Sequence, residues 1–155
     1  MMFAFISIAV FFMMEGISWC THKYVMHGFG WFLHEDHHQP RYDGFEKNDV
    51  FFVIFAIPSM LLFYFSSVPG FSYLAAIGLG ILGYGIAYFL VHDVLIHQRF
   101  KWFKKTNNRY LKGLRKAHMI HHKNMKKEES KCFGMLFVPF KYFEKSKRIQ
   151  RKNTA

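Results

Sequence analysis

The sequence predicts an all-α integral membrane protein with about three to four transmembrane helices and a cytoplasmic histidine-rich metal domain. Three stretches of about 20 residues are almost free of charge, and a helix of this length can cross a bilayer. All ten histidines lie outside these stretches, in four short clusters. Since the chain has 155 residues, we expect one membrane-embedded domain over 1–155.

The three predicted spans lie at about 1–20, 50–68 and 71–91. The first carries Glu15 as its one charged side chain, and the other two carry none. A soluble protein can bury helices of this kind in its core, but it rarely contains three of them. The first span lacks the basic start and the small-residue cleavage site of a signal peptide, so we expect it to be retained.

Lysine and arginine residues predict the orientation of the spans. The connection 66–72 has no charge, whereas the loop 21–49 carries three basic residues and most of the 21 follow residue 91. Because cytoplasmic loops are enriched in Lys and Arg, we expect a multi-pass protein of the cell membrane with both charged regions in the cytoplasm. The histidine clusters and the basic tail 141–155 then share that side, with the tail near membrane lipid. This topology explains the net charge of +11 without nucleic-acid binding.

Four clusters, or boxes, contain all ten histidines, and their spacings occur twice. The H-x4-H boxes are His22 with His27 and His92 with His97, and the H-x2-H-H boxes are His34, His37, His38 and His118, His121, His122. Neutral imidazole is the commonest protein ligand for first-row transition metals, and ten ligands are more than one ion can use. We therefore expect all ten to be ligands in a cage for two ions, rather than ordinary surface and core histidines. In each half of the chain, a predicted span leads into an H-x4-H box, and an H-x2-H-H box follows further along the sequence.

The spacings within the boxes predict local structure. Positions i, i+3 and i+4 share one face of a helix, so each H-x2-H-H box predicts a short helix whose histidines converge on one centre. Positions i and i+5 lie about 140° apart on an ideal α-helix. An H-x4-H box therefore needs either a break in the helix or a π-type irregularity. Gly28 and Gly30, which follow His27 closely, favour a break.

Acidic residues accompany the boxes. Glu15 precedes His22 by seven residues and could accept a hydrogen bond from a ligand imidazole, or it could reach toward the membrane interface. Asp93, beside His92, is a candidate acceptor for an imidazole or a ligand. Glu35 and Asp36 occupy the variable positions of an H-x2-H-H box, so we expect them to face solvent.

The segment 133–143 is apolar and contains Pro139. Eleven residues are too few to cross a bilayer as a helix. We expect this segment to lie in the membrane interface or to cover the metal domain. Upstream of it, Asn107 and Asn108 predict a turn in the basic insert between the last two boxes.

Three runs of sequence together resemble the β-carotene 3-hydroxylases of the fatty-acid hydroxylase and sterol desaturase superfamily. The runs are HKYVMHGFGWFLHEDHH from His22 with the polar turn to Asn48 and Asp49, HDVLIHQRF from His92, and AHMIHH from Ala117. The resemblance covers about residues 15–139. Gly28, Gly30 and Trp31 favour the carotenoid branch, whereas the stretch 129–139 is a looser match.

The resemblance implies a carotenoid substrate and a non-haem di-iron centre held by the histidine boxes. O2 would be the co-substrate, with electrons from a ferredoxin or an NAD(P)H reductase chain. The implied reaction is hydroxylation at C3 of a β-ionone ring, which converts β-carotene through β-cryptoxanthin to zeaxanthin. Such a substrate is insoluble in water, so the phenylalanine-rich spans could form a channel from the bilayer. Basic residues that could dock an acidic ferredoxin are Lys101, Lys104, Lys105, Arg109, Lys112, Arg115 and Lys116.

Other functions share some of these features. A fatty-acid or sterol hydroxylase or desaturase, or a carotenoid ketolase, would use the same centre with a different pocket. A non-enzymatic metal transporter or haem protein should place histidines within its spans, and here none lies there.

Overall fold

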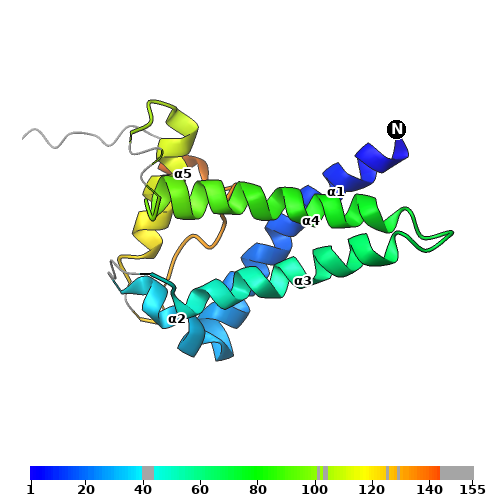
Figure 1. Ribbon diagram of the computed structural model, residues 1–155. Coiled ribbons are helices and arrows are strands. Elements are labelled where there is room, and N and C mark those ends of the chain that lie inside the picture. The colour runs from blue at the N-terminus through cyan, green and yellow to red at the C-terminus, as the bar shows by residue number, and fades with distance from the viewer. Residues whose placement is uncertain (40–43, 101, 103–104, 125, 129, 144–155) are drawn as a thin grey trace, which may run out of the picture.

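A computed structural model describes the chain apart from residues 40–43, 101, 103–104, 125, 129 and 144–155 (Figure 1). The described residues form helices and connections and contain no strand. In chain order the elements are α1 (Met2–Cys20), η1 (Thr21–Phe29), α2 (Trp31–His38), η2 (Lys47–Asp49), α3 (Val50–Phe65), α4 (Leu74–Phe89), η3 (Leu90–Ile96), α5 (Arg109–His121) and η4 (Phe140–Tyr142). Most of the predicted basic tail, 144–155, lies outside the described residues.

Three helical segments are long and apolar enough to cross a membrane, which confirms the predicted spans. They are Met2–Phe29, Lys47–Phe65 and Leu74–Ile96. α3 and α4 run antiparallel and are joined by the connection 66–73 (Figure 1). At this connection α3 ends at Phe65 and α4 begins at Leu74, short of the predicted limits 68 and 71. At the other end the helical segments run past the predicted limits, to Phe29 and Ile96, and so include His22, His27 and His92.

Small residues bring the three spans together in the half of α4 nearest to the 66–73 connection. A Cβ atom on Gly80 would lie 2.6 Å from the carbonyl oxygen of Ser7 on α1, and one on Gly78 would lie 3.2 Å from that of Ser59 on α3. The hydroxyls of Ser7 and Ser59 donate to the backbone oxygens of Ala76 and Gly78, both at 2.9 Å. Close backbone approach of this kind is how helices associate in lipid.

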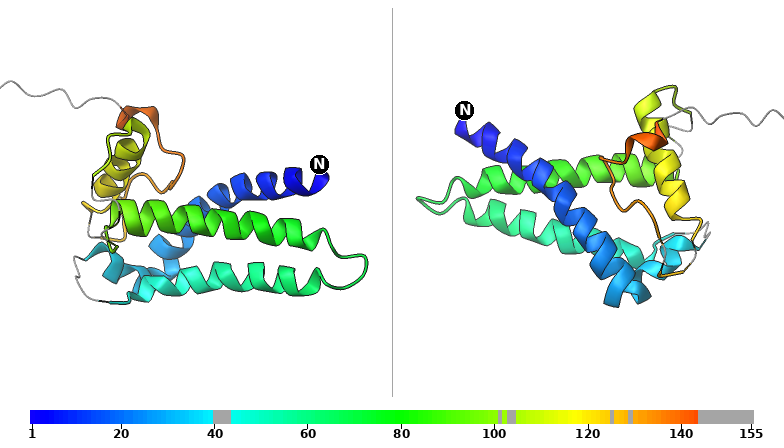
Figure 2. Two further views of the ribbon diagram at one scale, coloured as in Figure 1. Left: turned by 45° about the horizontal axis from the view of Figure 1, so that its top comes forward. Right: turned by 180° about the vertical axis from the view of Figure 1, so that it is seen from behind.

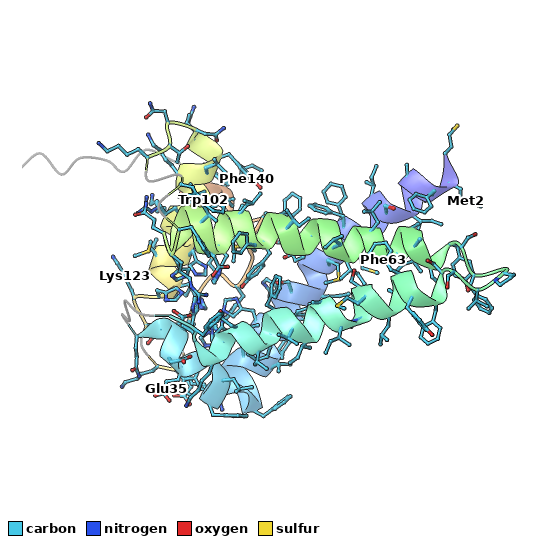
Figure 3. All side chains as sticks on the ribbon, in the orientation of Figure 1. Met2, Glu35, Phe63, Trp102, Lys123 and Phe140 are labelled. Atoms are coloured by element: carbon cyan, nitrogen blue, oxygen red, sulfur yellow. The ribbon has the colours of Figure 1, made fainter. Side chains whose placement is uncertain are left out.

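The short helices α2 and α5 lie together at one end of the spans. The N-terminus and the 66–73 connection lie at the opposite end in both views of Figure 2. Figure 3 shows nitrogen-bearing side chains gathered at the α2 and α5 end, where Glu35 and Lys123 are labelled, far from Met2. The structure therefore brings the four boxes to one end of the spans, as predicted, and the side of the membrane stays a prediction.

Candidate metal centre

π-helical turns carry both H-x4-H boxes. α1 continues into η1 and α4 continues into η3. In η3 the backbone N–H of His97 donates to the carbonyl oxygen of His92 at 2.9 Å, a bond across five residues that defines a π-turn. The two rings consequently lie 4.5 Å apart, and those of His22 and His27 lie 5.3 Å apart. The predicted break between the two histidines is wrong, and the π-type irregularity is what occurs.

The glycines after the first box turn the chain instead. Gly28 has the non-helical angles φ −109° and ψ −126°, directly after His27. The backbone N–H of Gly30 donates to the carbonyl oxygen of Val25 at 2.8 Å, and a Cβ atom on Gly30 would lie 3.0 Å from that oxygen. Gly30 can therefore pack tightly against the last turn of η1, and α2 begins at the next residue.

The H-x2-H-H boxes lie on α2 and at the end of α5, which confirms the predicted short helices. Asn108 caps α5, because its side-chain oxygen accepts from the backbone N–H groups of Tyr110 at 2.8 Å and Leu111 at 3.2 Å. His122 is the residue that caps the carboxyl end of α5. The second box thus ends its helix, with the imidazoles on its last turn.

The ten imidazoles gather in two sets, here called set A and set B. Within each, the potential ligand atoms lie within 4.8 Å of one another. Set A consists of His22, His27, His34, His38 and His121, and set B of His37, His97, His118 and His122. We add His92 to set B because its Nε2 lies 3.0 Å from that of His37, and its ring lies 4.9 Å from that of His118. Eight of the ten residues are buried.

Each half of the chain sends one histidine into the set built by the other half. Set A receives His121 from the second half, and set B receives His37 from the first. The exchanged residue is the i+3 member of each H-x2-H-H box, while the i and i+4 members stay with their own half. The prediction that each box converges on one centre is wrong, because adjacent residues point about 100° apart on a helix. Each box therefore reaches two centres.

In set A, the Nδ1 atom of every histidine donates to a neutral oxygen. His34 donates to Oδ1 of Asn48 at 2.7 Å. The other four donate at 3.0–3.2 Å to the backbone carbonyl oxygens of Phe133, Lys127, Asn124 and Lys131. Because a carbonyl oxygen can only accept, these bonds place the proton on Nδ1 and the lone pair on Nε2.

In set B, two Nδ1 atoms donate to carboxylates. His37 donates to Oε2 of Glu46 at 2.7 Å, and His92 donates to Oδ2 of Asp93 at 3.2 Å. Asp93 therefore lies where an acceptor that orients an imidazole would lie. Burial raises the pKa of Glu46, and the positive charge of Arg99 opposes this rise.

The Nε2 atoms, which are the inner nitrogens of the two sets, face one another in pairs, and each carries a lone pair. Where both Nδ1 atoms have acceptors, the Nε2 atoms lie 3.0–3.2 Å apart in the pairs His22–His34, His34–His38, His27–His121 and His37–His92. Burial lowers the pKa of His34 to about 3 and that of His121 to about 2, which disfavours a second proton on these two rings. Two nitrogens bound at about 2.1 Å to one ion, at right angles, lie about 3 Å apart.

A metal cation therefore fits both sets. It would satisfy the facing lone pairs, which otherwise repel one another. The buried Nε2 of His122 also has no hydrogen-bond partner among the described residues, so set B holds a further donor atom for an ion. Neutral imidazole with Nδ1–H held by an acceptor is the usual form of a histidine ligand.

The comparisons with known proteins agree with this geometry. The sequence model of the family described as fatty acid hydroxylase matches residues 7–143, which include all four boxes. The chain belongs to the fatty acid hydroxylase family. No solved structure matches the chain.

Several curated relatives of the hydroxylase carry closely related names. The chain is 46% identical over 126 residues to β-carotene hydroxylase of Pantoea ananas, which covers 81% of this chain and 71% of the relative. It is 33% identical over 135 residues to β-carotene hydroxylase of Paracoccus sp. (strain PC1), a match that covers 86% of this chain and 83% of the relative. It is 43% identical over 115 residues to the chloroplastic β-carotene 3-hydroxylase of Haematococcus lacustris, a match that covers 70% of this chain and 35% of the relative.

Glu15 ties the C-terminal segment of the hydroxylase to α1. Its Oε1 accepts from the backbone N–H groups of Met135, Leu136 and Phe137 at 2.9–3.0 Å. Its Oε2 accepts from the hydroxyl of Tyr84 on α4 at 2.8 Å. These partners occupy the carboxylate, and none of them is a histidine. The prediction that Glu15 orients a ligand imidazole is therefore wrong, and the carboxylate anchors a segment of backbone.

The anchored segment covers set A, as one alternative for 133–143 predicted. The ring of Phe133 packs edge-on against the rings of His22, His27 and His121, with centroids 5.2–5.4 Å apart. Its carbonyl oxygen accepts from His22, so one residue both shields and orients the site. The interactions made by Glu15 thus position a wall of the metal centre.

Arg99 organises a layer of carboxylates beside set B. Its Nη1 and Nη2 donate to the two carboxylate oxygens of Asp49 at 2.7 and 2.8 Å, and Nη1 also donates to Asp93 at 2.9 Å. Asp49 in turn accepts from the backbone N–H of Glu46 at 3.0 Å. Glu46, Asn48 and Arg99 were not predicted as site residues. Asn48 and Arg99 stand in the runs that carry the family resemblance, but no spacing indicates that Glu46 and Asn48 accept from imidazoles or that Arg99 binds Asp93.

Asp36 is buried, which corrects the expectation that it faces solvent. Its Oδ2 accepts from the backbone N–H of Lys47 at 2.8 Å, so the side chain links α2 to η2. Its neighbour Glu35 is exposed, as predicted. The two variable positions of this box therefore differ in role: one holds the polar turn against α2, and the other faces outward.

An apolar cavity of about 550 Å³ lies between α1, α3 and α4 and reaches set B. Its lining includes His92 and Asp93 from η3, and otherwise Met14, Ser18, Met26, Asn48, Asp49, Phe51, Phe52, Phe55, Ala56, Ser59, Met60, Phe63, Ile81, Leu82, Tyr84, Gly85, Ile86, Tyr88 and Phe89. Of these, Phe52, Met60, Leu82 and Ile86 are 44–68% exposed on α3 and α4. The cavity therefore opens sideways between these helices, and its volume is typical of ligand sites.

Proposed function

We propose that this chain is an O2-dependent carotenoid hydroxylase that adds a hydroxyl group at C3 of β-ionone rings. It would convert β-carotene through β-cryptoxanthin to zeaxanthin. The observation that carries the proposal is an apolar cavity that opens toward lipid and ends at His92 of the candidate metal centre. The relatives support the substrate, because they are named β-carotene hydroxylases and one name specifies position 3.

We propose that set A and set B each hold one iron ion, with all ten histidines as ligands. When bound, the iron pair supplies the activation of O2, with electrons from a ferredoxin or an NAD(P)H reductase chain. Zinc accepts similar ligands but has no redox chemistry, which is why iron suits the reaction. The chain itself fixes seven of the ten rings through Nδ1, namely all five of set A and His37 and His92 of set B, so these ligand atoms are oriented before an ion binds.

The cavity residues would bind and orient the hydrocarbon. Tyr88 packs against His92 with ring centroids 4.8 Å apart and planes tilted by 30°, so these two rings form the inner end of the cavity. Phenylalanines from α3 and α4 form the apolar walls along which a polyene can lie. A β-ionone ring that enters through the sideways opening would meet the metal centre with one edge, while the rest of the molecule stays among apolar side chains.

We also propose the topology and the donor surface that the sequence predicts. The chain would be a single domain in the cell membrane, with the boxes in the cytoplasm. Lys105, Arg109, Lys112 and Lys116 are exposed near and on α5, where an acidic ferredoxin could dock. Lys101 and Lys104 of the predicted docking surface lie outside the described residues.

Pigment analysis tests the proposed reaction. A bacterial strain that accumulates β-carotene and expresses this chain aerobically should contain zeaxanthin, measured by HPLC. The same strain with His118→Ala should retain β-carotene, since His118 is a buried member of set B. Unchanged β-carotene in the first strain, with the protein verified in the membrane and a ferredoxin reductase chain co-expressed, would contradict the proposed substrate.

Filling the cavity should slow the reaction without disturbing the metal centre. Gly85 lines the cavity, and a Cβ atom there would meet nothing within 4 Å, so Gly85→Leu places its side chain in open cavity space. We expect at least a tenfold loss of zeaxanthin formation, which corresponds to about 1.4 kcal/mol. Iron content per chain should stay at the wild-type value.

The matched control for this variant is Gly16→Leu. Gly16 is exposed on α1, and a Cβ atom there also meets nothing within 4 Å. It gives the same change of residue on the lipid-facing side of another span. Equal turnover in the two leucine variants would show that the substrate does not use this cavity.

A further inference from the structure

The two histidine sets differ in the charge of the groups that accept hydrogen bonds from their Nδ1 atoms. All five Nδ1 acceptors of set A are neutral, four carbonyl oxygens and the amide of Asn48. In set B, His37 and His92 donate to the carboxylates of Glu46 and Asp93. The two sets thus share their ligand type but differ in the charge of the layer behind it.

Arg99 holds the carboxylate of Asp93 in place and, through Asp49, the backbone of Glu46. It binds Asp93 directly, and it binds Asp49, which accepts from the backbone N–H of Glu46. Its Nη2 also donates to the carbonyl oxygen of Gly44 at 3.1 Å, so the guanidinium is fixed from several sides. The bonded group contains three carboxylates and one guanidinium and leaves a net negative charge behind set B.

A carboxylate behind a histidine ligand changes how strongly the ring binds a cation. Accepting the Nδ1 proton makes Nε2 more basic, and the negative charge stabilises positive charge on the ion. In a buried site these interactions are screened less than in water. An ion in set B would experience both effects, whereas an ion in set A would face neutral acceptors.

We propose that Glu46 and Asp93, held by Arg99, make the two metal positions unequal, so that the ion of set B is bound more tightly and stabilised in its higher charge state. The proposal rests on the proposed metal centre. His92 and Asp93 also line the cavity, so the tightly held ion would be the one that faces the substrate. Set A, covered by Phe133, would then hold the more exchangeable ion.

Chelation kinetics test the inequality. The purified full chain in detergent, loaded with ferrous iron, is challenged with a chromogenic iron chelator. We expect two iron ions per chain, released in two phases of equal amplitude whose rates differ by about 10- to 100-fold. Mössbauer spectra of the same sample loaded with the 57Fe isotope should show two doublets of equal area.

Three variants that preserve side-chain shape assign the phases. Glu46→Gln and Asp93→Asn each remove one charge behind set B and should speed the slow phase about tenfold or more, with the fast phase unchanged. Asn48→Asp is the matched reverse change, because it places a carboxylate behind His34 of set A. It should slow the fast phase and bring the two rates together.

The outcomes separate this inference from the proposed function. Two ions that leave in one phase, or two phases that none of the variants alters, would overturn the inequality and leave the metal centre standing. A wild-type chain that binds no iron would overturn the proposed centre and the inequality together. If Glu46→Gln does not fold, Asp93→Asn and Asn48→Asp still decide the result.

Discussion

Replacement of His121 by alanine is expected to empty the metal position formed mainly by the other half of the chain. His121 is fully buried on α5, yet its Nε2 lies 3.2 Å from that of His27 in set A. Its removal should lower the iron content from two ions per chain to about one and abolish zeaxanthin formation, because the reaction needs both ions. His37→Ala should do the same for set B. Metal analysis and HPLC of the same preparations check both values.

Neighbours on the same helices supply the controls. Met119→Ala and Glu35→Ala remove exposed side chains from α5 and α2, and both variants should keep iron and activity. Alanine at any of the other eight histidines should likewise abolish turnover while the protein still inserts in the membrane. Full activity in several of these variants would contradict the shared cage, and retention of set A iron in His121→Ala would contradict the exchange between halves.

The local features of the metal centre could be predicted from the sequence because they depend on short spacings. The i, i+3, i+4 pattern of His34, His37 and His38 requires a helix if the rings are to lie near one another, and α2 provides it. The five-residue spacing of His92 and His97 is incompatible with a regular α-helix, so an irregularity was required. Two irregularities were compatible with the spacing, and the glycines after His27 pointed to the wrong one.

The hydrogen-bond acceptors of the Nδ1 atoms could not be predicted, because they depend on how segments distant in the sequence meet in the fold. The acceptors for His22 and His27 are backbone carbonyl oxygens of Phe133 and Lys127, more than 90 residues away, and any residue type can supply such an oxygen. The allocation of His37 and His121 to the sets of the opposite halves depends on where the fold places α2 and α5 at the end of the spans, which no spacing within a box encodes. Glu15 stands out in the sequence as an acid within a span, but its partners are three backbone amides and the hydroxyl of Tyr84, and no spacing connects them to it.

Removing the carboxylate of Glu15 should destabilise the protein more than any other change outside the histidine boxes. In Glu15→Leu the amides of residues 135–137 and the hydroxyl of Tyr84 lose their acceptor within a span. A buried group left unpaired costs about 1–3 kcal/mol, so we expect the free energy of unfolding in detergent to fall by at least about 3 kcal/mol. Thermal unfolding monitored by circular dichroism measures this change.

Glu15→Gln distinguishes the loss of acceptors from the loss of charge. Its amide oxygen can still accept from the backbone N–H groups of 135–137, so we expect less than half of the destabilisation seen with leucine. Glu35→Gln, at an exposed site on α2, should change the free energy of unfolding by less than about 0.5 kcal/mol. Because the anchored segment carries Phe133 against set A, Glu15→Leu should also release iron from set A faster than the wild-type chain does, with release from set B unchanged. Wild-type unfolding and wild-type release in Glu15→Leu would show that the carboxylate does not hold the covering segment.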